Sequence, residues 1–173
     1  LETLRQAAII QSTESSNRIE QITAPLKRIQ ELVAQKTTPT NRSEEEIAGY
    51  RDVLTTIYSS FRDIPFTVSV VLQFHRDLYA HTKVPGGRFK RTDNEITEVY
   101  PDGTAAVRFR PLSAVETPSA VKQLHEQFMR AWEAGEVSRL LLIPAYVLDF
   151  LCIHPFTDGN GRMARLLTLL LLY

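Results

Sequence analysis

The residues best suited to chemistry lie together in one short stretch, residues 154–165. It contains a group that can take up a proton near neutral pH, His154, and a hard oxygen ligand, Asp158. It also contains two guanidinium groups, Arg162 and Arg165, placed three residues apart. Guanidinium groups grip phosphate through two parallel hydrogen bonds, so this combination indicates chemistry on a phosphate-containing substrate.

The local sequence predicts how these side chains are presented. Pro155 disfavours helical geometry at His154, so the apolar helix before it should end there. The glycines of the loop 158–161 let the backbone approach a ligand closely, and a new helix should begin at its end. The free N–H groups and positive dipole of that helix start form an anion site. Asp158 beside it suits a Mg²⁺ ion shared with a phosphate, and Phe156 should anchor the loop in the core.

This stretch, HPFTDGNGRMAR, resembles the signature of the Fic family, HPFx[D/E]GNGRxxR, and it matches every fixed position. Upstream, the segments Phe74–Leu78 and Gly86–Phe89 and the hairpin after them resemble the family's pre-flap helix and flap, so the resemblance covers about Ser12 to Tyr173. It implies a mainly α fold: a helical bundle with one β-hairpin flap beside the active-site loop. It also implies an enzyme, a nucleotidyltransferase that moves AMP from ATP to a Ser, Thr or Tyr hydroxyl of a target protein (AMPylation).

The resemblance gives each position of the signature a role. His154 would be the catalytic base that deprotonates the target hydroxyl, and Arg162, also catalytic, would stabilise the leaving phosphates. Asp158 would hold the Mg²⁺ cofactor between the α- and β-phosphates of ATP, and Arg165 would meet the γ-phosphate. Gly159, Asn160 and Gly161 would form the anion hole, and the implied nucleotide-binding residues are Phe156, Gly159, Asn160, Gly161, Arg162 and Arg165. The related Doc-type toxins, which transfer phosphate, carry Lys where this chain has Gly161, so this glycine favours nucleotidyl transfer.

A second resemblance lies near the start of the chain. Ser16–Glu20 resembles the family's inhibitory motif, [S/T]xxxE[G/N], although Gln21 stands where Gly or Asn is expected. In the family, the glutamate pairs with the second arginine of the signature and keeps the γ-phosphate out of its productive place. The resemblance therefore implies inhibitory roles for Ser16 and Glu20, with Glu20 pairing with Arg165. Taken by itself, the same segment also fits a solvated helix face.

Composition limits the class of protein. The chain has 173 residues, room for one domain of ordinary size, and its 20 Lys and Arg balance its 20 Asp and Glu. This balance argues against binding nucleic acid through bulk charge, so nucleic acid would be contacted only by a domain outside this chain. Cys152, the only cysteine, excludes an internal disulfide and should be buried and inert. The longest apolar stretch, residues 140–153, is too short to cross a membrane, and we expect a cytoplasmic protein with no membrane partner.

The elements that must position the site are mostly helices. Apolar spacing and end signals predict helices over about 2–14, 16–22, 26–36, 43–61, 68–80, 117–134 and 140–153, and another from 160 or 161 onward. Ser43 and Glu46 form a capping box, Thr67 can cap the next helix, and Pro144 should lie near a helix entry. Pro101–Gly103 predicts the turn of a β-hairpin between residues 96–100 and 107–109.

A lone hairpin has no sheet to support it, so it should lie beside something that it covers. We expect it to bind an extended stretch of the target by strand addition, with the protein itself as one acceptor. Lys90 and Arg91, which open the hairpin, fit either solvated charges or contacts to the target. We expect an N-terminal helical segment with the inhibitory motif over residues 1–40 and a catalytic core over 41–173. The chain lacks an initial Met and ends in an apolar helical run, so we expect a C-terminally incomplete domain of a longer protein.

Two alternatives to AMP transfer remain open. The first is a different enzymatic outcome: transfer of another phosphate-containing group, or removal of AMP (de-AMPylation) with Glu20 positioning water. The second is a nucleotide-sensing regulatory module with negligible transfer. The intact His154 and Arg162 argue against the second alternative, and the mass of the product would distinguish the outcomes of the first.

Overall fold

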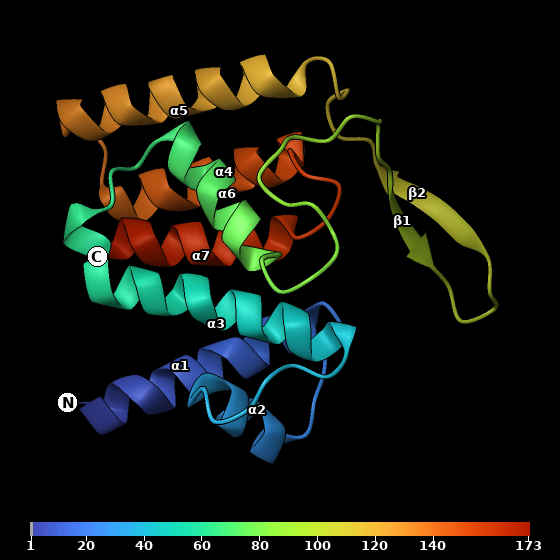
Figure 1. Ribbon diagram of the computed structural model, residues 1–173. Helices are drawn as coiled ribbons and strands as arrows, with labels where there is room; N and C mark the ends of the chain where they lie inside the picture. Colours follow the sequence, from blue (N-terminus) through green and yellow to red (C-terminus); the bar gives the residue numbers. More distant parts are fainter. Residues whose placement is uncertain (1) are drawn as a thin grey trace. The chain divides into compact units, whose positions relative to one another are not determined.

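The computed structural model describes residues 2–173 of the chain (Figure 1). The described residues form seven α-helices, a short 3-10 helix and one antiparallel pair of strands, so the expected mainly α fold is confirmed. They fall into two compact units: residues up to 88 together with 161–173, and residues 89–160. No described helix combines the length and the apolar character that crossing a membrane requires.

The first unit is built around α3. Its helices are α1 (Glu2–Ile19), α2 (Leu26–Val33), α3 (Arg42–Ser60), α4 (Val68–Leu78) and α7 (Asn160–Leu172, in the unit from residue 161), with the 3-10 helix Phe61–Asp63 after α3. α3 packs against α1, α2 and α4 and buries Ile47, Leu54 and Ile57, which recur at helical spacing. Gly49 allows α3 to approach α4 closely, because a Cβ at this position would collide with the main-chain carbonyl of Leu78.

Side-chain caps define two helix starts in this unit. Thr67 caps α4 as predicted, since its Oγ1 accepts a hydrogen bond from the Val70 N–H at 3.2 Å. The predicted cap of α3 is wrong by two residues: Asn41, not Ser43, accepts the bond from the Glu44 N–H, at 3.0 Å. Asparagine at this position satisfies an N–H group that the first turn leaves without a partner inside the helix.

The predicted division of the first helix is also wrong. α1 is continuous through its polar middle and ends at Ile19. The polar side chains do not break it, because Asn17 Nδ2 donates back to the carbonyl of Thr13 at 2.8 Å. Thr13, Ser16 and Asn17 are buried, so this polar stretch is a packing face of the helix.

The second unit contains two helices and the hairpin. Its elements are β1 (Ile96–Val99), β2 (Ala105–Phe109), α5 (Thr117–Ala134) and α6 (Arg139–Ile153). α5 and α6 pack together, with the rings of Phe128 and Tyr146 4.8 Å apart. Pro144 lies inside α6, not at its entry as predicted. It is on the exposed side of the helix, where water can solvate the carbonyl that proline leaves without a donor.

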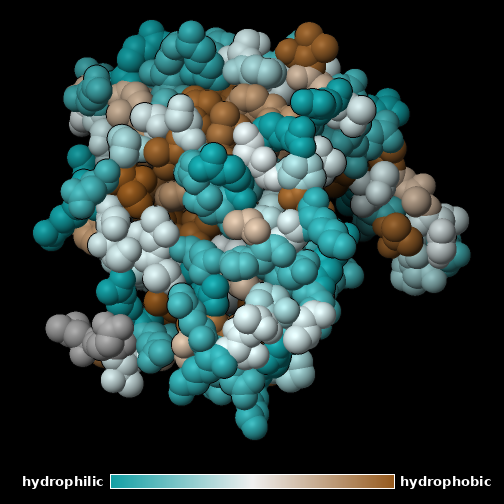
Figure 2. Space-filling model, viewed as in Figure 1, coloured by the Kyte–Doolittle hydropathy of each residue, from teal (hydrophilic) through white to brown (hydrophobic). Residues whose placement is uncertain are grey.

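The predicted hairpin is confirmed. β1 and β2 pair in register from Ile96 opposite Phe109 to Val99 opposite Ala105, with an irregularity after Ile96. Gly103 closes the turn in the left-handed region, with a φ of 83°. The hairpin, at the right of Figures 1 and 2, exposes hydrophobic and hydrophilic side chains together. Its exposed apolar residues are Ile96, Val99, Tyr100, Val107 and Phe109.

Candidate active site

The loop that carries the first signature residues lies at the end of α6, in the second unit. α6 ends at Ile153, as Pro155 predicts, and His154 caps it in the left-handed backbone region, with φ 52° and ψ 61°. The His154 N–H donates to the carbonyl of Phe150 at 2.9 Å. A non-glycine residue in this region is strained, and such residues gather where the surrounding structure fixes a functional side chain.

Phe156 anchors this loop in the core of its unit, as the sequence predicts. The side chain is fully buried, and its ring lies 6.1 Å from that of Phe89 and 6.2 Å from that of Phe150. Asn160 closes the loop around it: its Oδ1 accepts the Phe156 N–H at 2.9 Å, and its Nδ2 donates to the Phe156 carbonyl at 2.8 Å. The Asn160 side chain therefore shapes the loop.

Asp158 is exposed in the same loop. Its Oδ1 accepts the N–H of Gly159 at 2.6 Å, and Gly159 has a φ of 82°, which glycine adopts without strain. The described part of the chain has no group of three or more His, Cys, Asp or Glu side chains that could hold a metal ion. A cation at Asp158 would therefore take most of its ligands from water and substrate. Mg²⁺ binds in this way, so the single exposed carboxylate fits it.

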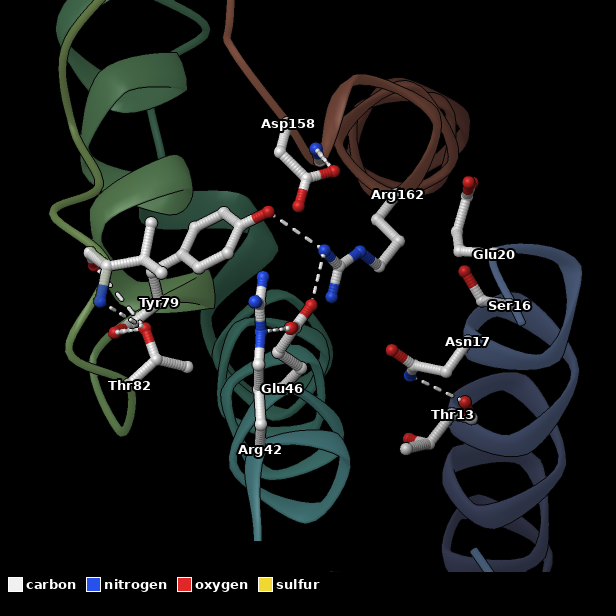
Figure 3. Close-up of polar contacts among 12 residues, drawn as sticks. Thr13, Ser16, Asn17, Glu20, Arg42, Glu46, Tyr79, Thr82, Asp158 and Arg162 are labelled. Atoms are coloured by element: carbon white, nitrogen blue, oxygen red, sulfur yellow. Dashed lines mark hydrogen bonds and ion pairs between the residues drawn. The ribbon is translucent and has the colours of Figure 1, made fainter. Parts of the chain in front are cut away.

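In the first unit, the start of α7 lies against α1 through Arg165. Its Nη2 is 2.7 Å from Glu20 Oε1 and 3.0 Å from the Ser16 carbonyl, and its Nε donates to Ser16 Oγ at 2.7 Å. Figure 3 shows Ser16 and Glu20 on successive turns at the end of α1. The Arg165 and Glu20 side chains are 32% and 36% exposed, so solvent reaches this ion pair. The predicted pairing of Glu20 with Arg165 is present in the structure.

The absence of a side chain at Gly161 leaves room for the Glu20 carboxylate. A Cβ at this position would collide with Glu20 Oε1 and would lie 3.3 Å from Arg165 Nη1. The carboxylate therefore sits against the first turn of α7, where free N–H groups and the helix dipole favour an anion. Glu20 therefore places a negative charge at the helix start that the sequence predicts as an anion site for phosphate.

Arg162 is held deep inside the first unit. Its side chain is 1% exposed, and its Nη2 lies 2.8 Å from Glu46 Oε2 and 2.9 Å from the hydroxyl of Tyr79 (Figure 3). Arg42 Nε donates to the other oxygen of Glu46 at 2.9 Å. Arg162 thus connects the start of α7 to Glu46 of α3 and to Tyr79, the residue that follows the last turn of α4. Glu46 and Tyr79 could not be predicted as partners of Arg162, because only the folded chain brings them together.

Gln21 has a backbone conformation that glycine and asparagine adopt more readily than glutamine. It follows Glu20 in the left-handed region, with a φ of 61°. The Ile22 N–H donates to the Asn17 carbonyl at 3.0 Å and the Gln21 N–H to the Arg18 carbonyl at 2.9 Å, which is the Schellman pattern of a helix end. The turn therefore forms with glutamine, at the cost of backbone strain that glycine would avoid.

Both interpretations of Lys90 are wrong. The residue is 3% exposed, and its Nζ donates to the carbonyl of Ile153 at 3.1 Å and to Asn94 Oδ1 at 2.9 Å. Burial lowers the pKa of this ammonium group below its ordinary value of 10.5. Arg91, next to it, is exposed, which fits a solvated charge. A partner 63 residues away in the chain leaves no local sequence signal.

The prediction for Cys152 is wrong as well. The buried residues of α6 are Ile143, Tyr146, Phe150 and Ile153, which follow one helical stripe. Cys152 lies off this stripe and is exposed. It lines a groove of about 450 Å³ in the second unit, together with Leu112 near the end of β2, Leu124 of α5 and Asp149 of α6.

Residues 65–172, more than half of the chain, match the Fic/DOC family. The chain therefore belongs to this family, as its signature and its mainly α fold with a single hairpin indicate.

Relatives agree with this assignment. The protein adenylyltransferase Fic of Nematostella vectensis is 25% identical over 166 residues, which cover 92% of this chain and 36% of that protein. The protein of the same name from Drosophila melanogaster is 30% identical over 114 residues, or 63% of this chain and 20% of that protein. The chain thus matches only about a fifth to a third of the length of these relatives.

Solved structures share the fold. A Fic-domain-containing signalling protein from Bacteroides thetaiotaomicron superposes with a TM-score of 0.82 at 24% identity, over 99% of this chain and 65% of that one. A Fic family protein from Desulfovibrio desulfuricans gives a TM-score of 0.73 at 21% identity, over 99% and 50%. At these identities, the likeness concerns the fold.

Proposed function

We propose that this chain is the catalytic domain of a protein adenylyltransferase, which transfers AMP from ATP to a hydroxyl group of a protein. The observation that carries the proposal is the start of α7, where Arg165 and the first helical turn hold the carboxylate of Glu20. A helix start that binds an anion in this way suits the phosphates of a nucleotide. Family membership and the name of the relatives, protein adenylyltransferase Fic, support the same activity.

His154 is the general base in this proposal. It takes the proton of a Ser, Thr or Tyr hydroxyl while the hydroxyl oxygen attacks the α-phosphorus of ATP. The bond between the α-phosphorus and the oxygen that bridges to the β-phosphorus breaks, and pyrophosphate leaves. The fixed left-handed backbone of His154 sets the direction in which the imidazole leaves the chain, so the base is positioned before substrate arrives.

The phosphates are held by the loop and by α7. The backbone N–H groups of Gly159, Asn160 and Gly161 form the anion hole, and Arg165 receives the γ-phosphate. Arg162 adds positive charge from its buried position, where Glu46 and Tyr79 fix it. When bound by Asp158, Mg²⁺ would neutralise charge that develops on the α- and β-phosphates.

Glu20 inhibits the enzyme by occupying Arg165. ATP must displace this carboxylate before its γ-phosphate can reach the guanidinium. An ion pair exposed to this degree contributes only about 1 kcal/mol or less. The two bonds from Arg165 to Ser16 hold the arginine in the same arrangement. A gate of about 1.4 to 2.8 kcal/mol, or roughly tenfold to hundredfold in rate, is in keeping with these contacts.

The hairpin is the proposed docking site for the target. Within the described chain β1 and β2 pair only with each other, so each has an outer edge to which an extended segment can add. The exposed apolar side chains of the strands would contact alternate residues of that segment. The protein itself is one proposed acceptor. The division into an inhibitory segment, residues 1–40, and a catalytic core, residues 41–173, is part of the same proposal.

Intact-mass measurement after incubation with ATP and Mg²⁺ tests the proposal. Wild type is compared with Glu20→Gly, with the protein itself and hydroxyl-bearing proteins as acceptors. We expect Glu20→Gly to add the mass of one AMP group, with release of pyrophosphate. A phosphate-sized gain, or loss of AMP from an acceptor modified in advance, would identify one of the other reactions. ATP binding without any mass change would identify a nucleotide-sensing module.

A further inference from the structure

We propose that Lys90 is a positioning residue for the general base: with Asn94, it holds the carbonyl before His154 and the carbonyls of the two residues after it. This inference rests on the role proposed for His154 in AMP transfer. Lys90 lies outside the signature, in the segment that leads into the hairpin, and it belongs to the same compact unit as the loop that it contacts.

The contacts of this segment converge on the backbone around the base. Lys90 Nζ donates to the carbonyl of Ile153 at 3.1 Å, and the Lys90 N–H donates to the carbonyl of Pro155 at 2.9 Å. Asn94 accepts from Lys90 Nζ at 2.9 Å and donates through Nδ2 to the carbonyl of Phe156 at 3.3 Å. The carbonyl before the base and the two carbonyls after its own are therefore all bonded to one short segment.

The Lys90 ammonium group is buried at the C-terminal end of α6, and hydrogen bonds there offset the cost of removing it from water. Ile153 is the last residue of α6, where carbonyls lack partners inside the helix and the dipole favours a cation. A buried lysine is rare unless such partners satisfy it. At 3% exposure, Lys90 directs its donors to the chain itself and is not placed to contact a nucleotide or a target protein.

These bonds act on the one strained residue of the loop. His154 has a left-handed backbone, which a non-glycine residue keeps only when its surroundings determine it strongly. The bond to the Ile153 carbonyl holds the peptide group before His154, and the bonds to the Pro155 and Phe156 carbonyls hold the chain just after it. A change of the His154 backbone would therefore have to break at least one of these bonds. Without them, the backbone can relax towards the common regions, and the imidazole then leaves the chain in another direction. A displacement of about 1 Å at a catalytic group can lower a rate about hundredfold.

The test compares Lys90→Met with Lys90→Arg, each in the Glu20→Gly background. Methionine keeps a long, unbranched side chain without the donors, whereas arginine keeps the charge and the donors. We expect Lys90→Met to lower kcat for AMP transfer by about tenfold to hundredfold, with KM for ATP and calorimetric ATP affinity unchanged. Lys90→Arg should recover at least part of the rate. The control Lys83→Met removes an exposed lysine and should leave the rate unchanged.

A second measurement does not depend on transfer. The chain has four histidines, so selective ¹³C and ¹⁵N histidine labelling gives a small set of resonances, and His154→Ala assigns the signal of interest. We expect Lys90→Met to shift the backbone carbons of His154 away from left-handed values and to leave the other three histidines in place. If Glu20→Gly shows no transfer, the proposed function fails while this spectrum still tests the role of Lys90.

Two results would overturn the inference. One is a Lys90→Met protein with full kcat and an unchanged His154 signal. The other is a loss of kcat and ATP affinity together, with all histidine signals disturbed, which would mean that Lys90 only supports folding. If Lys90→Met does not fold, Asn94→Ala replaces it, because the Asn94 side chain is only partly buried. This substitution removes the bond from Lys90 Nζ to Asn94 Oδ1, which Lys90→Met also removes, and the bond to the Phe156 carbonyl. It should shift the His154 signal in the same direction by a smaller amount.

Discussion

Two glutamines in this chain offer a controlled test of whether the turn after Glu20 contributes to the proposed inhibition. Gln21 follows the end of α1 with a φ of 61°, and Gln35 follows α2 with a φ of 53°. Both turns have the same closing bond, from Ile22 N–H to the Asn17 carbonyl at 3.0 Å and from Lys36 N–H to the Glu31 carbonyl at 2.9 Å. Glycine adopts this conformation without the strain of a side chain. Gln21→Gly and Gln35→Gly should therefore each raise the free energy of unfolding by about 1 kcal/mol.

The two substitutions should differ in their effect on activity. Gln21 directly follows Glu20, so a more stable turn holds the Glu20 carboxylate more firmly against Arg165. If Glu20 leaves Arg165 only when this turn opens, the same 1 kcal/mol is added to the gate. That energy corresponds to a decrease in basal transfer of about fivefold. Gln35 lies at the end of a different helix, so Gln35→Gly should leave the rate unchanged.

Denaturant unfolding and the initial rate of self-modification with saturating ATP measure the two effects. Gln21→Gly is also combined with Glu20→Gly, where no carboxylate remains for the turn to hold, and the slowing should then disappear. Equal transfer rates for Gln21→Gly and Gln35→Gly, at equal gains in stability, would refute the link between this turn and the gate. So would a Gln21→Gly protein that transfers AMP faster than wild type.

Three further predictions concern the site and its support. His154→Ala should lower transfer by about 10²- to 10⁴-fold while calorimetry shows ATP affinity largely retained; a collapse of affinity in a folded variant would contradict its role as base. Glu46→Ala should lower the free energy of unfolding by about 3–5 kcal/mol, because it removes the carboxylate that lies 2.8 Å from Arg162 in a buried ion pair, and a loss below 1 kcal/mol would contradict this. Hydrogen bonding from Arg28 lowers the pKa of Glu44 to about 2, so the stability from this pair should be present above about pH 4.5 and lost as pH falls towards 2. Acid unfolding of Glu44→Gln should lack this part of the pH dependence.

Local sequence signals were enough for much of the fold. Pro155 ends α6, Thr67 caps α4, and the turn at residues 101–103 forms the hairpin as predicted. Each of these signals acts within a few residues of the structure that it specifies. The signature residues could be found for the same reason, because residues 154–165 are contiguous in the chain.

The distant residues that hold the signature residues in position could not be predicted in this way. Arg162 bonds to Tyr79, 83 residues away, and Lys90 bonds to a carbonyl 63 residues away. Lysine and glutamate side chains are usually solvated and are buried only when paired, so their residue types did not predict that Lys90 and Glu46 are buried. The polar stretch of α1 was misleading for a related reason: it predicted a break between residues 14 and 16, but the helix is continuous there, and Asn17 in this stretch is a buried residue bonded within the helix.

Transfer of label from ATP to Glu20→Gly tests the central claim most directly. The protein is incubated with Mg²⁺ and with ATP labelled either at the α-phosphate or at the γ-phosphate, beside wild type and the double variant Glu20→Gly/His154→Ala. AMP transfer predicts that α-label, and not γ-label, becomes bound to a hydroxyl side chain, at least about tenfold faster in Glu20→Gly than in wild type. The double variant should lose this incorporation. Incorporation of γ-label, or of neither label on any hydroxyl acceptor, would contradict the assignment of this chain as an adenylyltransferase.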